Sequence, residues 1–211
     1  MPQGERLWHA EVISEETVRV LRDLNRTSLL TAFYLAGGTG LALHLGHRRS
    51  RDLDFFTEES FDVDRAIDRL RECTALHVLE KAEGTLHVSL EGARVSFLRY
   101  SYPLLFAAEA FQEVKVADPR DIACMKISAL GSRGTRRDFI DLYAVAQLYG
   151  LSRLVKNFEG KFRQVSYSRV HLLKSLTYFE DARQDPMPDM LAPLSWDDVE
   201  GFFSVEVPML L

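Results

Sequence analysis

Two aspartates that stand two positions apart, Asp52 and Asp54, are the residues of this sequence best suited to chemistry. In a β-strand, residues two apart share a face, so both carboxylates would point the same way while Leu53 enters the core. Neighbouring carboxylates repel each other, and a fold rarely gains stability from such a pair. Mg²⁺ resolves the conflict, because it binds one or two carboxylates together with substrate phosphates. The pair therefore predicts a metal site made by Asp52 and Asp54, for Mg²⁺ or Mn²⁺.

A glycine-rich turn precedes the aspartates and is suited to holding phosphate. Gly37 and Gly38 follow the apolar run 33–36, which predicts a buried strand, and residues 39–45 predict a short helix. Glycine lets the backbone turn sharply and approach a ligand closely. The first amides of a helix attract anions. We therefore expect the nucleotide-binding residues to be Gly37, Gly38, Thr39, Arg49 and Ser50.

Other interpretations fit parts of this stretch. A surface turn followed by an edge strand with solvated acids would explain the aspartates alone. A dinucleotide-binding fingerprint begins well at Gly38 and Gly40 but fails at Leu43, where helix and strand must pack closely. A Walker A loop is excluded because no Gly-Lys-Ser/Thr follows. The whole order of strand, Gly-Gly-Thr, helix and Ser-x-Asp-x-Asp is more specific than its parts and favours a nucleotidyltransferase site.

The same stretch resembles the AbiEii/AbiGii toxin family of nucleotidyltransferase-like proteins, within the DNA polymerase β-type superfamily. The resemblance rests on Gly37-Gly38-Thr39 and Ser50-Arg51-Asp52-Leu53-Asp54, and later on residues 121–126, Arg133-Gly134 and residues 137–143. It implies an α/β fold, in which a mixed sheet flanked by helices is followed by an α-helical C-terminal domain. We place the boundary near residue 117, which gives a nucleotidyltransferase-like domain over 1–117 and a helical domain over 118–211 that completes the cleft.

The resemblance adds Lys126 and Asp138 to the catalytic site. These residues lie on successive predicted helices, over 122–130 and 136–148, in otherwise apolar surroundings. By resemblance, Lys126 neutralises phosphate charge, and Asp138 orients it or acts as a base. An internal ion pair that holds the two helices together is the alternative, because buried charges need partners.

One position departs from the superfamily pattern. Such sites usually take a third carboxylate from a strand like the one predicted over 93–98, but no acid occurs between Gly92 and Leu104. The plausible position holds Ser96, which leaves a two-carboxylate site or a site without catalysis. His87, on the preceding strand of a predicted hairpin, is interpreted as a sheet-surface residue rather than a ligand.

The resemblance implies Mg²⁺-dependent transfer of a nucleoside monophosphate from a nucleoside triphosphate to an acceptor, with RNA, and tRNA in particular, as the expected acceptor. It also implies the toxin of a toxin–antitoxin system with a separately encoded antitoxin. Two alternatives stay open: a catalytically inactive nucleotide-binding module, and a protein-interaction module whose cleft is vestigial.

The composition limits the partners of this chain. Its formal net charge of −5 gives no global basic field for nucleic acid, so RNA contacts would need the local basic stretches 47–51 and 133–137. The polar residues 1–5 lack a signal-peptide core, and no apolar run approaches the ~20 residues of a membrane helix. We therefore expect a cytoplasmic protein without membrane contact, in which Cys73 and Cys124 are free, buried thiols.

The remaining pattern predicts the other elements. Ser14 caps a first helix that continues to Leu30, and a charged amphipathic helix follows over 62–73. Residues 76–80 and the hairpin 86–98 predict strands, and 114–116 closes the sheet. Beyond Asp118, we expect only helices, including 151–162, 168–179 and a capped final turn from Ser195.

Overall fold

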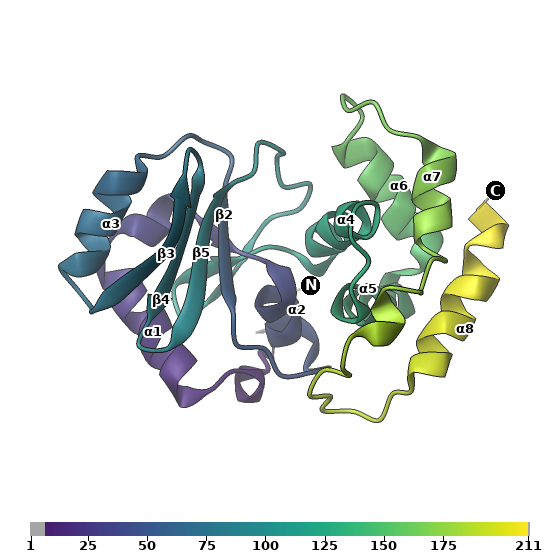
Figure 1. Cartoon of the computed structure of the whole chain (residues 1–211), viewed down its shortest axis with the longest axis horizontal. Helices are drawn as coiled ribbons and strands as arrows, with labels where there is room; N and C mark the ends of the chain where they lie inside the picture. The colour runs from purple at the N-terminus through teal and green to yellow at the C-terminus, as the bar shows by residue number, and fades with distance from the viewer. Residues whose placement is uncertain (1–6, 211) are drawn as a thin grey trace, which may run out of the picture. The chain divides into compact units, whose positions relative to one another are not determined.

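The computed structural model describes residues 7–210, and the chain divides into two compact units (Figure 1). The first unit ends at Ala117 and omits the segment Leu104–Ala107. The second unit contains that segment and the chain from Asp118 onwards. Residues 1–5, whose polar character entered the expectation of a cytoplasmic protein, lie outside the described residues, as does Leu211.

Within residues 7–210, the first unit contains one mixed sheet of seven strands in the order β3-β4-β5-β2-β1-β7-β6. The strands are β1 (Tyr34–Leu35), β2 (Leu53–Thr57), β3 (Leu76–Ala82), β4 (Thr85–Leu90), β5 (Ala93–Arg99), β6 (Glu109–Phe111) and β7 (Val114–Val116). β2 pairs antiparallel with β1 and parallel with β5, which places Asp54 opposite Ser96. The predicted hairpin is β4 and β5, with His87 opposite Ser96. The sequence did not predict β6, because its residues Glu-Ala-Phe do not alternate between apolar and polar, as Val-Lys-Val of β7 does.

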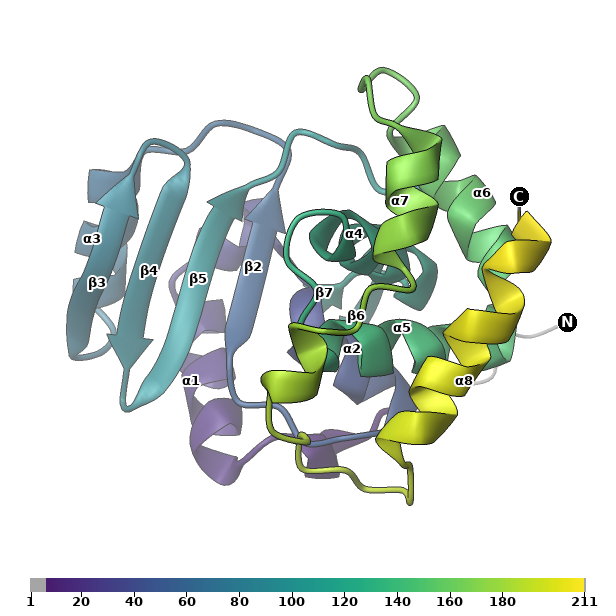
Figure 2. The same cartoon turned by 45° about the vertical axis from the view of Figure 1, so that its right-hand side comes forward.

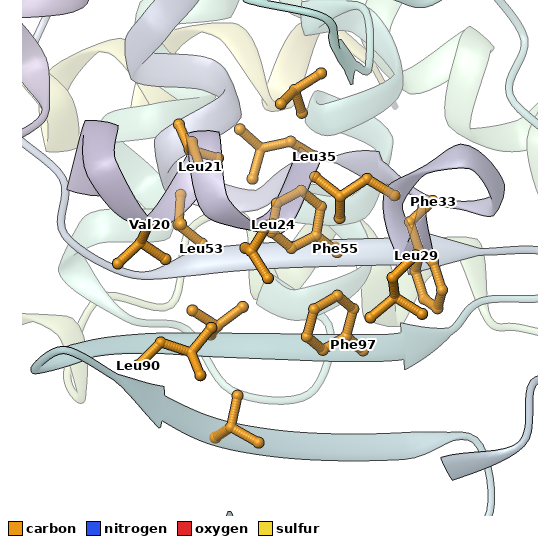
Figure 3. Packing of buried hydrophobic residues seen from close by; sticks show 14 of the residues in the cluster. Val20, Leu21, Leu24, Leu29, Phe33, Leu35, Leu53, Phe55, Leu90 and Phe97 are labelled. Carbon is orange, nitrogen blue, oxygen red and sulfur yellow. The ribbon is translucent and has the colours of Figure 1, made fainter. Parts of the chain in front are cut away.

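Two helices, α1 (Glu15–Arg26) and α3 (Val63–Arg71), cover the same face of this sheet (Figure 2). Figure 3 shows Leu21 and Leu24 of α1 packed among Leu53, Phe55 and Phe97 from β2 and β5, all of them buried. Full burial of such a side chain stabilises the fold by roughly 1.5–3 kcal/mol. The alternation of β2 therefore places Leu53 and Phe55 against the helices and Asp54 on the opposite face.

The expectation that the first helix continues to Leu30 is wrong. The helix begins as predicted, because the Ser14 hydroxyl accepts a hydrogen bond from the Thr17 amide at 3.2 Å. It ends at Arg26, where the Thr27 hydroxyl donates to the Leu24 carbonyl at 2.6 Å. Ser28 then adopts a left-handed conformation with φ 54°, and a 3₁₀ turn follows over Leu29–Ala32. A side chain that bonds the carbonyl in this way competes with helix continuation.

The second unit is helical, as predicted. Its helices are α4 (Pro119–Leu130), α5 (Arg136–Tyr149), α6 (Leu151–Lys161), α7 (Arg169–Ser175) and α8 (Trp196–Glu206). Asp118 caps α4 and Pro119 occupies its first turn, as predicted. Phe139 of α5 and Phe203 of α8 are fully buried, with ring centroids 5.5 Å apart, and they dock the final helix on this unit.

Two further expectations need correction. α7 stops at Ser175 rather than Phe179, and here the Ser175 and Thr177 hydroxyls bond the carbonyls of Leu172 and Lys174. Cys73 is exposed, because α3 ends at Arg71 and leaves the cysteine in the turn that follows. Cys124 is free and buried in α4, as expected. No helix within residues 7–210 is long and apolar enough to cross a membrane.

Candidate active site

The glycine turn begins the helix α2 (Gly37–Leu45), two residues earlier than the sequence predicted. Gly37 has φ 61°, and a Cβ atom at this position would lie 2.7 Å from Asp54 Oδ2. Only glycine fits here, because a side chain would suffer both backbone strain and a collision with the carboxylate. The capping residue Ala36 offers no side-chain hydrogen bond to the helix. The first amides of α2 and the Asp54 carboxylate therefore lie at the same end of the helix.

The two aspartates alternate with buried residues as predicted. Leu53 and Phe55 have no exposed surface, whereas Asp52 and Asp54 are half-buried. In the described part of the chain, no cluster of three or more His, Cys, Asp or Glu residues could hold a metal ion. A metal at this pair would thus take its remaining ligands from phosphate and water. Two carboxylate side chains and no nitrogen or sulfur donor suit Mg²⁺ or Mn²⁺, and Gly37 keeps a side chain out of the space beside Asp54.

Thr39 and Ser50 hold the loop before Asp52 against α2. Thr39 Oγ1 lies 2.7 Å from Ser50 Oγ and also hydrogen-bonds the carbonyl oxygen of Asp52. The Ser50 amide donates to the Val12 carbonyl at 3.0 Å. Thr39 is buried, and its hydroxyl contacts this loop. The predicted contacts of Thr39 and Ser50 with phosphate stay predictions.

Arg48 is a residue that the sequence did not single out. Its guanidinium lies against Gly38, where any Cβ atom would collide with Nη2, and its Nη1 donates to the Arg49 carbonyl at 3.1 Å. Arg48 is buried, so the basic stretch 47–51 is not a continuous surface for RNA. Arg49 and Arg51 are exposed. The structure thus brings one buried cation to the glycine turn and leaves Arg49, the predicted nucleotide-binding residue, on the surface.

Ser96, which stands where a third acid was expected, contacts a histidine. Ser96 is buried on β5 and directly opposite Asp54 in the register of β2 and β5. His87 Nδ1 lies 3.0 Å from Ser96 Oγ across the hairpin. The sequence predicts His87 on the sheet surface, and its alternation with buried Leu86 and Val88 agrees. The signal that it missed was the cross-strand pairing.

In the helical unit, Lys126 contacts two carboxylates rather than one. Lys126 Nζ lies 2.8 Å from Asp138 Oδ1 and 2.8 Å from Asp141 Oδ2. Burial would lower the pKa of Lys126, but the charges of Asp141 and Asp138 outweigh it and raise this pKa. Asp138 also accepts a hydrogen bond from Thr135 Oγ1 at 2.6 Å. The spacing of Asp138 and Asp141 by three residues was the available signal for the second partner.

The basic stretch 133–137 is only partly a surface. Arg136 Nε and Nη2 donate to the carbonyls of Ala182 and Arg183 at 2.9 and 2.7 Å, and its guanidinium lies over the Trp196 ring. Arg136 therefore holds the chain before α8 in place. Arg133 and Arg137 are exposed and remain available to a polyanion.

A family comparison identifies the class of protein to which this site belongs. The family described as "Nucleotidyl transferase AbiEii toxin, Type IV TA system" matches residues 19–103 and 85–199, which together span most of the chain. The chain belongs to the AbiEii nucleotidyltransferase toxin family. The sequence-based identification is confirmed, and the protein is a nucleotidyltransferase by family.

Related proteins support the AbiEii assignment along the chain. An uncharacterized protein of Aquifex aeolicus strain VF5 is 37% identical over 204 residues, which cover 92% of this chain and 96% of that protein. Among solved structures, the nucleotidyltransferase toxin MenT4 of Mycobacterium tuberculosis H37Rv is 16% identical, with a TM-score of 0.55, and covers 93% of this chain and 85% of its own. JHP933 of Helicobacter pylori is 15% identical, with a TM-score of 0.53, over 94% and 93% of the two chains. At these identities, the two structures show a shared nucleotidyltransferase fold.

The AbiEii match bears on the predicted class of enzyme, and the site geometry bears on the predicted site residues. The match supports the class of enzyme, while the geometry places the Asp54 carboxylate against Gly37 and the Arg48 guanidinium against Gly38 in the first unit. Lys126 and Asp138 form their own cluster in the helical unit. Their part in catalysis, and that of the helical domain in completing a cleft, stay predictions.

Proposed function

We propose that this AbiEii protein transfers a nucleoside monophosphate from a nucleoside triphosphate to an acceptor hydroxyl, with Asp52 and Asp54 as the metal-binding pair. The observation that supports this most directly is the Asp54 carboxylate, which lies against Gly37 at the start of α2. The helix amides then bind the phosphates of the triphosphate, and the carboxylate binds the metal ion that contacts the same phosphates. A bound Mg²⁺ or Mn²⁺ ion would supply charge stabilisation for the departing pyrophosphate.

The chain's own residues have separate tasks in this proposal. The amides of Gly37 and Gly38 bind phosphate oxygens, and the absence of side chains there leaves room for Asp54 and Arg48 beside the turn. The buried Arg48 adds a positive charge beside Gly38. Thr39 and Ser50 hold the segment that carries Asp52. In the helical unit, Lys126 is proposed to neutralise phosphate charge and Asp138 to orient it, as the family resemblance implies.

We further propose RNA, with tRNA as the first candidate, as the acceptor, and a separately encoded antitoxin as the partner. The family description, which names a type IV toxin–antitoxin system, supports the antitoxin. Exposed Arg49 and Arg51 in the first unit and Arg133 and Arg137 in the second offer local cations for an RNA backbone, although the formal net charge is −5. Such contacts would make binding fall steeply with salt concentration.

Transfer is tested by incubating the protein with each α-labelled nucleoside triphosphate, Mg²⁺ and total RNA. We expect label in RNA with wild type and a loss of at least about a thousandfold with Asp54→Asn, since a metal-bridged charge interaction is removed. Asparagine has nearly the size of aspartate and keeps an acceptor oxygen, so the variant should fold. Asp68→Asn, an exposed acid on α3, is the matched control and should transfer normally.

A thermal-shift experiment separates transfer from binding alone. Two carboxylates make a weak Mg²⁺ site without phosphate, so nucleotide and metal should stabilise the protein only together. Equal shifts with nucleotide and EDTA would contradict a metal-bridged site. A metal-dependent shift without transfer to any RNA would instead favour the inactive nucleotide-binding module, the alternative suggested by Ser96.

A further inference from the structure

A row of polar residues crosses four strands of the sheet, on the face opposite α1 and α3. In register, the row contains Glu80 of β3, His87 of β4, Ser96 of β5 and Asp54 of β2. The residues on either side of Ser96, Val95 and Phe97, are buried in the core, which fixes the direction of the row. The row therefore extends from Asp54, a member of the proposed metal-binding pair, across the neighbouring strands of the sheet.

His87 is held in this row by one hydrogen bond and has one nitrogen left over. Nδ1 lies 3.0 Å from Ser96 Oγ, and no other hydrogen bond of His87 exists among residues 7–210. The imidazole is half-buried while Ser96 is buried, so the ring is anchored at Ser96 and partly exposed beyond it. Neighbouring strands are about 4.8 Å apart, which puts the backbone of His87 about 10 Å from that of Asp54. The two side chains could address the same phosphoryl centre from opposite sides.

Transfer to a hydroxyl needs a group that accepts its proton. A neutral imidazole is the usual acceptor near neutral pH, whereas a carboxylate that binds metal is a weak base. No aspartate or glutamate occurs on β5 or in the residues up to Leu104. A serine hydroxyl can accept the Nδ1 proton, and this tautomer leaves the lone pair of Nε2 available.

We propose that His87 Nε2 takes the proton of the attacking acceptor hydroxyl and that Ser96 holds the imidazole in the required tautomer. This inference rests on the proposed function. The hydroxyl oxygen forms a bond to the α-phosphorus, and the bond from that phosphorus to the bridging oxygen breaks. The bond's electron pair leaves with pyrophosphate, and the hydroxyl proton passes to His87 Nε2. His87 is then a catalytic residue and Ser96 a positioning residue.

The charges that face His87 come from three strands. Glu80 is its register partner on β3, His77 lies two positions before the bulge of that strand, Arg94 lies on β5 and Asp54 lies beyond Ser96 on β2. His77 is exposed on the same face and forms no hydrogen bond among the described residues. It is therefore a matched control, with the same chemistry at a position remote from Ser96.

The test compares His87→Gln, Ser96→Ala and His77→Gln in single-turnover release of pyrophosphate, with RNA as acceptor. We expect His87→Gln to slow release by about a hundredfold or more, since a general base contributes 10²–10⁴-fold. Ser96→Ala should slow release less, and His77→Gln should match wild type. The thermal shift produced by nucleotide with Mg²⁺ should be the same in all four proteins, because the proposed base does not bind nucleotide.

The pH profile supplies the second readout. Wild-type release should fall on the acidic limb of the profile, because a protonated imidazole cannot accept the proton of the hydroxyl. That acidic limb should disappear in His87→Gln and persist in His77→Gln. If His87→Gln released pyrophosphate as fast as His77→Gln, with the same pH profile, His87 would not be the general base. The proposed nucleotidyl transfer would be unaffected by that result. If wild type released no pyrophosphate with any nucleotide and RNA, the proposed transfer would fail and the base with it.

Discussion

Lys126 carries its charge between two carboxylates of the following helix. The Asp141 side chain has no exposed surface, and the side chains of Lys126 and Asp138 are 12% and 10% exposed. Such an ion cluster is sensitive to the loss of one member, because the remaining charges are left without compensation. The contacts agree with the internal ion pair that the sequence left open.

We expect Lys126→Met to destabilise the protein by about 3–5 kcal/mol, because two buried carboxylates lose their counter-charge. Urea unfolding of this variant measures the cost, with Lys174→Met, an exposed lysine on α7, as the control. Activity of the still-folded variant is measured separately. Normal transfer would remove Lys126 from the catalytic site, and strong coupling with Asp138→Asn in transfer would support it.

The raised pKa of Lys126 predicts how this cost depends on pH. A group whose pKa is higher in the folded than in the unfolded protein stabilises the fold fully below the unfolded pKa. The contribution is lost as the pH rises through the folded pKa. The difference in unfolding free energy between wild type and Lys126→Met should thus be constant from about pH 7 to 9 and shrink above about pH 10.4. A difference that shrank near neutral pH would contradict the ion cluster.

The two cysteines differ in exposure and therefore in reactivity. Burial raises the pKa of the Cys124 thiol to about 12, and the nearby Asp121 adds to the shift. Cys73 is exposed in the turn after α3. Because the thiolate is the reactive form, a thiol reagent at about pH 8 should label the native protein once, at Cys73, and the unfolded protein twice. Peptide mapping of the labelled site checks this, and rapid native labelling of Cys124 would contradict it.

At the scale of elements, the start of α2 combines a conformational and a steric requirement. Gly37 needs a left-handed backbone, and its Cα faces the Asp54 carboxylate. Gly92, in the turn between β4 and β5, also has a positive φ of 87°, but a Cβ there would meet nothing within 4 Å. A comparison of substitutions at the two glycines therefore separates the cost of backbone strain from the cost of the collision with Asp54.

We expect Gly92→Ala to cost about 1–2 kcal/mol from backbone strain alone. Gly37→Ala should cost more and should also abolish the thermal shift produced by nucleotide with Mg²⁺, because the new methyl group displaces Asp54. The shift measured for Gly92→Ala should equal that of wild type. A Gly37→Ala protein that kept the full shift would show that the nucleotide does not use this turn.

At the scale of the whole molecule, the chain passes between its two units more than once. The segment Leu104–Ala107 belongs to the helical unit, although β5 precedes it and β6 and β7 follow it in the first unit. Asp121 of α4 accepts hydrogen bonds from the Leu105 and Phe106 amides at 3.0 and 2.9 Å. Lys161 of α6 donates to the same carboxylate at 2.7 Å. The segment is thereby fixed to the helical unit by a buried ion pair.

Lys161→Met should destabilise the helical unit by about 3–5 kcal/mol, since Asp121 would keep a buried charge. Lys161→Met combined with Asp121→Asn should cost less, because no charge is then left uncompensated. Lys156→Met, on an exposed position of the same helix, is the control. Unfolding curves measure the costs, and hydrogen exchange of the Leu105 and Phe106 amides should rise with the destabilisation. Additive costs would argue against the pair.

Local rules were enough to predict much of the chain. The spacing of Asp52 and Asp54 predicts that they share a face, because side chains alternate along any single strand, and both residues are half-buried on either side of the buried Leu53. The caps at Ser14, Asp118 and Ser195 could be read in the same way, since a cap bonds an amide two or three residues away. Helix ends were harder, as α1 and α7 show, because hydroxyl groups near each end compete for the same carbonyls.

Only the tertiary structure decided which distant residues meet. Ser96 and His87 contact each other because strand register places them opposite, and Lys126 gains Asp141 because α4 packs against α5. Arg48 looked like a surface cation in the sequence and is buried, with its guanidinium against Gly38 of the distant glycine turn. Pairing, burial and charge compensation depend on residues far apart in the chain, whereas alternation and capping depend on the next few. The sequence by itself thus determined the aspartate pair, the glycine turn and the family, while the tertiary structure decided the partners of Ser96, Lys126 and Arg48.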